Sequence, residues 1–177
     1  VCMKRHPPEE PEDDGGPLFR HSDTLAIARA AVRAAIDDGS VCPCCDQLAK
    51  RYKRKLNAGM AATLCWLARA QGLEPAAEFI MLPSVAPRFA LRYGGDFSRL
   101  IHWGMIETLA SDDPEKRTSG LWRATEKGIA FVRGEIAVPS HVLVYNNESH
   151  GLVGDAVTSA QAIGKRFNYA ELMAGEK

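Results

Sequence analysis

Three cysteines crowd into one short segment, Val41-Cys42-Pro43-Cys44-Cys45. Cys42 and Cys45 have the spacing of two thiolates that tetrahedral zinc accepts, but a closed structural site needs four ligands. We therefore weigh a zinc site on Cys42 and Cys45 against a plain turn, closed by Pro43, whose thiols stay reduced. Zinc is the one cofactor that the sequence suggests. Cys44 in the same segment is either a third ligand or simply a neighbour. The other ligands would come from Cys2 and His6, from His21 or from a second subunit.

Basic side chains are the second group with a chemical use. The chain has 22 basic and 22 acidic residues, so any attraction for nucleic acid must come from local segregation of charge. Residues 48–70 contain six basic residues and no acidic one, whereas residues 1–24 contain six acidic and three basic residues. The acidic part is a tail, and we expect the basic part to be a helix.

That basic helix is expected over residues 46–71. Apolar residues recur there every three or four positions, and Gly72 would end the helix. Lys50, Arg51 and Arg54 then fall on the face opposite the apolar stripe, where they either contact phosphates or form an ordinary solvated surface. The apolar stripe consists of Leu48, Tyr52, Leu56, Met60, Leu64 and Leu67.

The chain before the cysteines divides into a tail and a helix. Residues 1–21 form an acidic tail, rich in proline and glycine, that we expect to be disordered because it has almost nothing apolar to bury. Ser22 or Asp23 can cap a helix that runs through Ile36, with Leu25, Ala28, Val32 and Ile36 on one stripe.

The centre of the chain predicts helix, turn, helix and then two strands. Prolines and glycines break residues 76–106 into two short helices, the second over 96–103 and stopped by Gly104. A polar turn at 111–117 separates residues 105–107 from a strand at 120–125, and a further helix covers 126–132.

Residues 136–177 complete the fold. They predict a β-hairpin that turns at Asn146-Asn147, followed by one or two helical turns between Ala160 and Met173 packed on the body. The expected class is α+β, with one main domain over 22–135. No stretch is apolar enough to span a membrane and the start lacks the apolar core of a secretion signal, so we expect a cytoplasmic protein without a membrane partner.

Two segments resemble the winged-helix domain of bacterial transcription regulators of the multiple-antibiotic-resistance type. Trp103-Gly104-Met105-Ile106-Glu107 resembles the hinge that ends the recognition helix. Trp122-Arg123-Ala124-Thr125-Glu126-Lys127-Gly128 resembles the segment that closes the wing and starts the next helix. The resemblance covers about residues 76–133 and implies a winged helix-turn-helix, with a helical extension before it and the β-hairpin after it. The whole chain also looks like small proteins of bacteriophages and prophages.

The departures from the family matter for assembly. The loop before the expected recognition helix is rich in glycine, Tyr93-Gly94-Gly95-Asp96, and the family's dimerisation helices have no clear counterpart. A homodimer is possible, but the family's dimer geometry does not carry over.

The winged helix implies double-stranded DNA as the partner and regulation of transcription as the role. Ser98, Arg99 and His102 would lie on the recognition helix, with Arg99 the best candidate for reading a base edge. The expected phosphate contacts are Arg88, Arg92, Lys116, Arg117 and Arg123, together with Lys50, Arg51 and Arg54.

Two other classes of function are weighed against DNA binding. A winged helix can also serve as a protein-interaction module, an adaptor or inhibitor that does not bind DNA. Enzymatic activity is not expected, because the chain has no phosphate-binding glycine loop, nucleophile elbow or metalloprotease motif. A reactive Cys44 or Cys45 at a helix start would be the exception.

Overall fold

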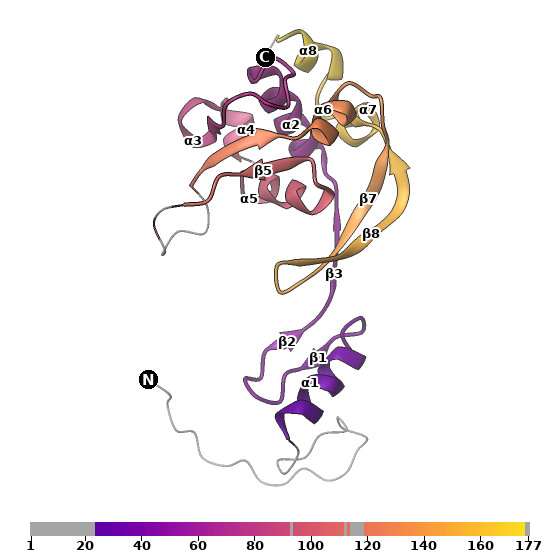
Figure 1. The fold of residues 1–177 in the computed structure, drawn as a ribbon. Helices are drawn as coiled ribbons and strands as arrows, with labels where there is room; N and C mark the ends of the chain where they lie inside the picture. The colour runs from indigo at the N-terminus through magenta and orange to yellow at the C-terminus, as the bar shows by residue number, and fades with distance from the viewer. Residues whose placement is uncertain (1–23, 93, 112, 114–118, 176–177) are drawn as a thin grey trace. The chain divides into compact units, whose positions relative to one another are not determined.

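The computed structural model describes residues 24–92, 94–111, 113 and 119–175, and over these residues the chain is α+β, as the sequence predicts (Figure 1). It divides into two compact units, Val1–Arg51 and Tyr52–Lys177. The expected acidic tail lies outside the described residues, as do Ser22 and Asp23, the two candidate caps of the first helix.

The first unit contains one helix and a two-stranded sheet. Helix α1 covers Leu25–Ala34, which confirms the helix predicted between the tail and the cysteines. Strands β1 (Ser40–Val41) and β2 (Leu48–Ala49) pair antiparallel. The stripe of α1 is only partly buried, because Ala28 and Val32 are covered whereas Leu25 is 53% exposed.

The predicted helix over 46–71 is wrong in its first half. Strand β3 (Tyr52–Lys55) follows β2, and helix α2 (Ala58–Ala70) begins only after Asn57, whose side chain accepts a hydrogen bond from the Met60 backbone nitrogen. The i+3 and i+4 spacing suits a helix, but β3 instead pairs with a strand nearly ninety residues later in the chain. Long-range pairing therefore overrides the local pattern.

The segment after α2 contains more elements than the sequence predicts. It consists of strand β4 (Ile80–Met81), three short helices and a 3-10 helix. The helices are α3 (Leu82–Val85), α4 (Arg88–Arg92) and α5 (Gly94–Phe97), and the 3-10 helix η1 covers Ser98–Trp103. Pro83 lies in the first turn of α3 rather than breaking a helix, and Gly104 ends η1 with a left-handed φ of 69°, as expected.

Strands β5 (Ile106–Thr108) and β6 (Leu121–Ala124) and helix α6 (Glu126–Val132) confirm the predicted order of two strands and a helix. The sheet has the order β4-β6-β5, so the unexpected strand β4 pairs with the second strand of the hairpin. Thr125 caps α6 by accepting a hydrogen bond from the Gly128 backbone nitrogen.

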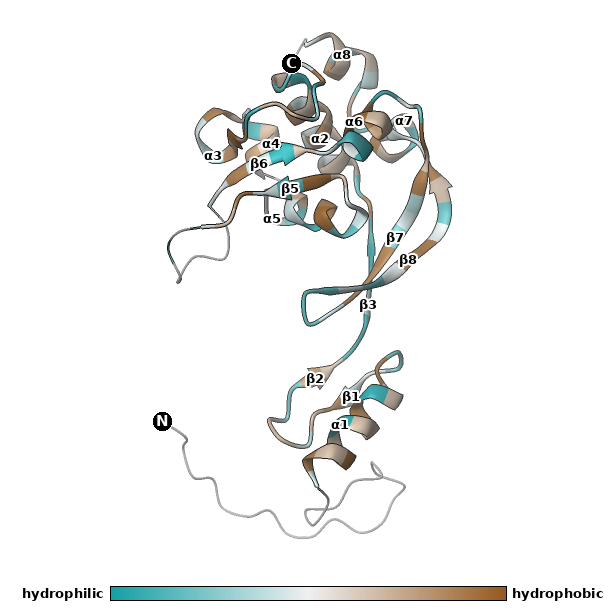
Figure 2. Ribbon diagram, in the orientation of Figure 1, coloured by the Kyte–Doolittle hydropathy of each residue, from teal (hydrophilic) through white to brown (hydrophobic). Residues whose placement is uncertain are grey.

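A second sheet has the order β3-β7-β8. Strands β7 (Val138–Tyr145) and β8 (Glu148–Val157) form a long twisted hairpin with β3 along one side (Figure 1). Its turn lies at Asn146 and Asn147, both with positive φ, as predicted for a two-residue turn. The Trp103 indole nitrogen donates to the Pro139 carbonyl oxygen at 2.7 Å, which ties η1 to β7. Figure 2 shows β3 as a hydrophilic strand.

Two short helices close the chain, as the sequence predicts. They are α7 (Ser159–Ile163) and α8 (Tyr169–Ala174), and each buries one aliphatic side chain, Ile163 and Leu172, in the core around α2. Among the described residues, no helix has the length and apolar character that crossing a membrane demands.

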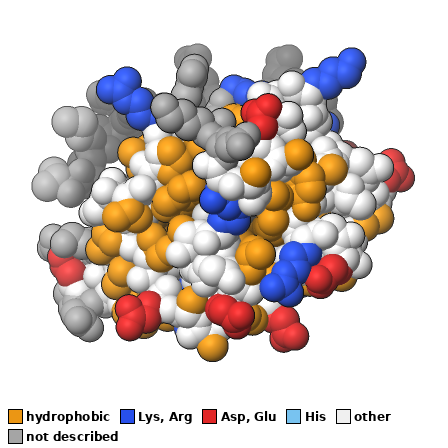
Figure 3. All heavy atoms as spheres, turned by 90° about the horizontal axis from the view of Figure 1, so that it is seen from above, with side chains coloured by type: hydrophobic (Ala, Val, Ile, Leu, Met, Phe, Trp, Pro, Cys, Tyr) orange, Lys and Arg blue, Asp and Glu red, His pale blue; other side chains and the backbone are white. Residues whose placement is uncertain are grey.

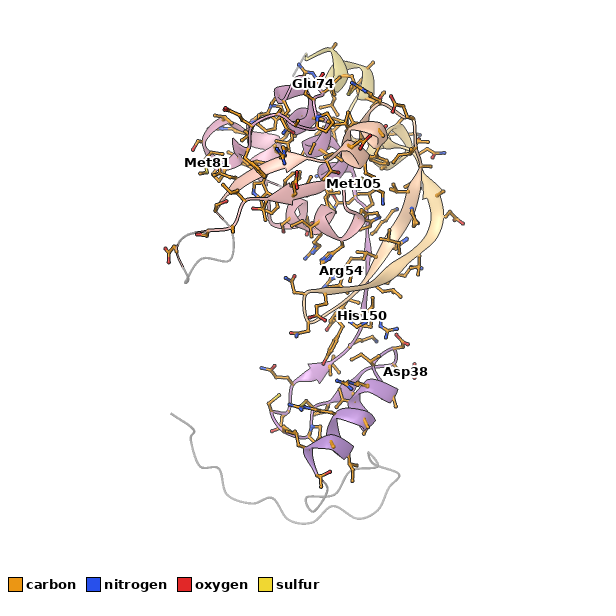
Figure 4. The ribbon with its side chains drawn as sticks, in the orientation of Figure 1. Asp38, Arg54, Glu74, Met81, Met105 and His150 are labelled. Carbon is orange, nitrogen blue, oxygen red and sulfur yellow. The ribbon has the colours of Figure 1, made fainter. Side chains whose placement is uncertain are left out.

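The packing of α6 against β5 predicts that Gly128→Ala is strongly destabilising. A Cβ at position 128 would lie 2.1 Å from the carbonyl oxygen of Met105, which is labelled in Figure 4, and backbone cannot yield as a side chain can. We expect the free energy of unfolding to fall by about 1–3 kcal/mol or more, measured by chemical denaturation. The control is Lys127→Ala on the exposed side of the same helix; equal stability of the two variants would show that the close contact is absent.

The bond between η1 and β7 gives a second prediction. Trp103→Phe keeps an aromatic ring in the core but leaves the Pro139 carbonyl without its donor. We expect a loss of about 1–3 kcal/mol in the free energy of unfolding, again from denaturant titration. A variant as stable as the starting protein would contradict a role for this hydrogen bond.

Candidate nucleic-acid interface

The segment Ser98–Trp103 presents a partly exposed polar side because its other side is anchored. Phe97, Leu100 and Trp103 recur every third residue and are all at most 1% exposed, a spacing that matches the three residues per turn of a 3-10 helix. The side chains between them, Ser98, Arg99, Ile101 and His102, are half-buried or exposed. Ile101 is 41% exposed although it is apolar.

Arg99 is held by an ion pair within its own turn. Its guanidinium contacts the Asp96 carboxylate, and both side chains are more than a third exposed. Asp96 also accepts a hydrogen bond from the Asn57 side-chain nitrogen at 3.2 Å. Since Asn57 caps α2, this chain of contacts fixes the start of the segment relative to the central helix.

The surroundings of His102 favour the neutral form of its imidazole. Partial burial lowers the pKa of its imidazole, and the positive charge of Arg99 lowers it further. A neutral imidazole has one donor and one acceptor nitrogen, so it can form a hydrogen bond with a base edge but gives no charge attraction to phosphate.

The structure describes only some of the other residues of this region that are predicted to contact phosphates. Arg88 is exposed at the first position of α4. Arg92 is the last residue of α4, and the described part of the chain does not include its side chain. Lys116 and Arg117 lie outside the described residues.

Arg123 is engaged inside the protein. Its Nε donates to Glu107 at 2.8 Å, its cross-strand partner on β5, and one terminal nitrogen donates to the Ala77 carbonyl oxygen at 3.1 Å. The guanidinium also lies over the Phe79 ring, 4.4 Å from its centroid. These contacts join the β5–β6 hairpin to the segment before β4, so Arg123 has a structural role.

Lys50 and Arg51 do not share a helix face with Arg54, which corrects the prediction. In the first unit, Lys50 donates to the Asp38 carbonyl oxygen, and Arg51 forms a 2.9 Å ion pair with Asp37. Both contacts join the residues that follow α1 to the residues that follow β2. Figure 4 labels Asp38, the acceptor in the first contact.

Strand β3 places three consecutive basic residues on the edge of the second unit's larger sheet. Lys53, Arg54 and Lys55 are all exposed, and Arg54, labelled in Figure 4, lies 4.8 Å from the centroid of the Tyr52 ring. Lys53 and Lys55 face His141, whose pKa is lowered by desolvation and by these two charges. Sequence reasoning missed Lys53 and Lys55, because in the predicted helix these two residues flank the apolar stripe whereas Arg54 lies opposite it; the signal available was an unbroken Lys-Arg-Lys run.

Charge is not gathered in the same way on the face that Figure 3 draws. Figure 3 shows one face on which hydrophobic side chains are spread widely and the described Lys, Arg, Asp and Glu side chains are scattered between them. That face therefore lacks, among its described side chains, the basic patch expected of a nucleic-acid footprint.

The cysteines fall into two environments. Cys65 is buried in α2, and burial raises the pKa of its thiol to about 12, so it is a core residue and not a nucleophile. Cys42 lies in the loop after β1, where hydrogen bonds from the Cys44 backbone and the Cys45 side chain lower the pKa of its thiol. Within the described residues, no group of three or more His, Cys, Asp or Glu side chains is placed to hold a metal ion.

Comparison with known proteins adds no assignment to this geometry. No family model matches the chain, and no curated protein and no solved structure is significantly similar to it.

Proposed function

We propose that residues 58–132 form a winged helix-turn-helix and that this unit binds double-stranded DNA. The observation that carries the proposal is the β4-β6-β5 sheet. Strand β4 leads directly into the short helices, and β5 and β6 follow them as a two-stranded wing. Because β4 is hydrogen-bonded to β6, the helices and the wing are parts of one sheet-linked unit that can dock on a duplex together.

The side chains available for base contacts are those between the buried positions of η1. Arg99 carries a fork of donors that suits guanine in the major groove, and Ser98 and His102 flank it. The ion pair with Asp96 holds Arg99 in a defined direction, which reduces the conformational entropy lost on binding. A base edge can compete for the donors that Asp96 does not occupy.

The phosphate contacts would come from exposed cations around this segment. The structure describes the exposed side chain of Arg88 on α4. Arg92, Lys116 and Arg117 are candidates from the sequence alone. Strand β3 adds exposed basic side chains next to residues 58–132 in the sequence. These side chains can contact phosphates although they lie on a strand, since phosphates are bound by charge rather than by a particular backbone structure. Arg123 is omitted from the proposed contacts because two of its nitrogens donate within the protein and its guanidinium lies over the Phe79 ring.

Salt dependence tests the proposal. We expect duplex DNA to bind at low salt and log affinity to fall linearly with log salt concentration, because each phosphate contact releases a counterion. Arg88→Ala should weaken all duplexes similarly and reduce the magnitude of the slope by about one unit. The measurement is fluorescence anisotropy of a labelled duplex across a salt series.

The matched control is Lys165→Ala, which removes one exposed positive charge outside residues 58–132. It should leave both the affinity and the slope at their starting values. Absence of binding at low salt would refute DNA binding and favour a protein-interaction module, and an equal effect of the two substitutions would refute the proposed docking face.

A further inference from the structure

Strand β3 lies at the edge of the β3-β7-β8 sheet, and among the described residues it pairs with another strand on one side only. All four of its residues are exposed, as expected of an edge that no described element covers. An edge strand presents unpaired backbone N–H and C=O groups, which form a template for a further strand. The free side of β3 is called the open edge below.

The hydrogen bonds to β7 determine which backbone groups point to the open edge. The Leu56 nitrogen donates to the carbonyl oxygen of Ser140, directly opposite, at 2.8 Å. In an antiparallel pair, such residues alternate with residues whose N–H and C=O groups point away from the partner strand. The register pairs Lys55 with His141 next to this bond. The N–H and C=O groups of Lys55, and of Lys53 two positions earlier, therefore point to the open edge.

Three consecutive side chains along this edge are positively charged. Because side chains alternate along a strand, Lys53 and Lys55 lie on one face of the sheet and Arg54 on the other. In the described part of the chain none of the three is in an ion pair, and Arg54 instead lies over the Tyr52 ring. A further strand would place its own side chains beside these charges, where opposite charges stabilise the pairing and like charges oppose it.

The charges and the backbone groups of the open edge together favour one kind of occupant. A second copy of β3 would bring like charges together, and lysines on an edge strand work against such pairing. A nucleic acid has the complementary charge, but its phosphates only accept hydrogen bonds, so the C=O groups of Lys53 and Lys55 would gain no donors. An extended acidic peptide supplies N–H donors, C=O acceptors and carboxylates at once.

We propose that the open edge of β3 binds an extended acidic segment of a partner protein as a fourth strand of the β3-β7-β8 sheet. Three consecutive carboxylates of the partner face the three cations, the middle one opposite Arg54 and the outer two opposite the lysines. The added strand spans only Tyr52–Lys55, because Leu56 is buried and α2 begins at Ala58. The proposal does not rest on DNA binding.

Fluorescence anisotropy of a labelled peptide, Thr-Val-Glu-Glu-Glu-Val-Thr-amide, titrated with the full chain tests the proposal. Lys53→Glu should weaken binding about tenfold, because an attractive cross-strand pair becomes repulsive. The control Lys165→Glu changes the net charge equally at an exposed position outside the sheet, and it should change the affinity by less than about twofold. A variant with both Lys53→Glu and Lys55→Glu should instead prefer a peptide whose outer two glutamates are lysines, and this reversal shows that the variant is folded.

Methylation of the peptide backbone separates strand addition from charge attraction alone. Two further peptides keep the sequence and the charge, but one carries N-methyl groups on the outer two glutamates and the other on the two valines. Only alternate N–H groups of an added strand face the sheet, so one of these peptides should lose binding and the other should keep it.

Four results would each overturn the proposal. They are no binding of the unmodified peptide at millimolar concentration and low salt, equal effects of Lys53→Glu and Lys165→Glu, equal binding of the two methylated peptides, and no reversal of preference in the double variant. A labelled single-stranded oligonucleotide is the comparison probe. If Lys53→Glu weakens the binding of the oligonucleotide and the peptide does not bind, the edge is a nucleic-acid site instead.

Discussion

The second unit depends on one helix that is buried on nearly every side. From Gly59 to Ala68, α2 exposes only part of Trp66, and it contacts α4, α5, α6, α7, α8 and β6. Small residues make this possible, because Ala61, Ala62 and Ala68 allow neighbouring elements to approach the helix closely. The helix is thus enclosed by other elements, and its sequence must be apolar on nearly all sides. A surface helix, in contrast, needs only a single apolar stripe.

The elements proposed to bind DNA are hydrogen-bonded to residues at both ends of this helix. At its start, Asn57 caps α2 and also binds Asp96, the partner of Arg99. At its end, the Gln71 side-chain oxygen accepts the Ala124 backbone N–H of β6 at 2.8 Å in the buried interior. A buried donor or acceptor left without a partner would cost more free energy than the hydrogen bond itself contributes to stability. The segment Ser98–Trp103 and the β5–β6 hairpin are therefore fixed in position relative to each other, because each is bonded to a residue at one end of α2.

Local signals in the sequence predicted those elements whose cause is local. The Asn146-Asn147 turn, the glycine stop at Gly104 and the helix after Thr125 all depend on residues within a few positions of one another. Strand β3 was missed because its partner lies beyond residue 140, and its side chains also fit a helical repeat. Of the site residues, Arg88 and Arg99 are accessible as expected, whereas Arg123 is engaged by Glu107 across a register that the sequence does not display.

The central claim is that the part of the second unit that contains Arg88 and Ser98–His102 binds a duplex. Its most direct test is a map of amide chemical-shift changes as a short DNA duplex is titrated into the isotopically labelled chain. The account predicts the largest changes in α4, in η1 and in the connection between β5 and β6, with α7 and α8 unaffected. Changes concentrated in α7 and α8, or no changes at saturating duplex at low salt, would contradict it.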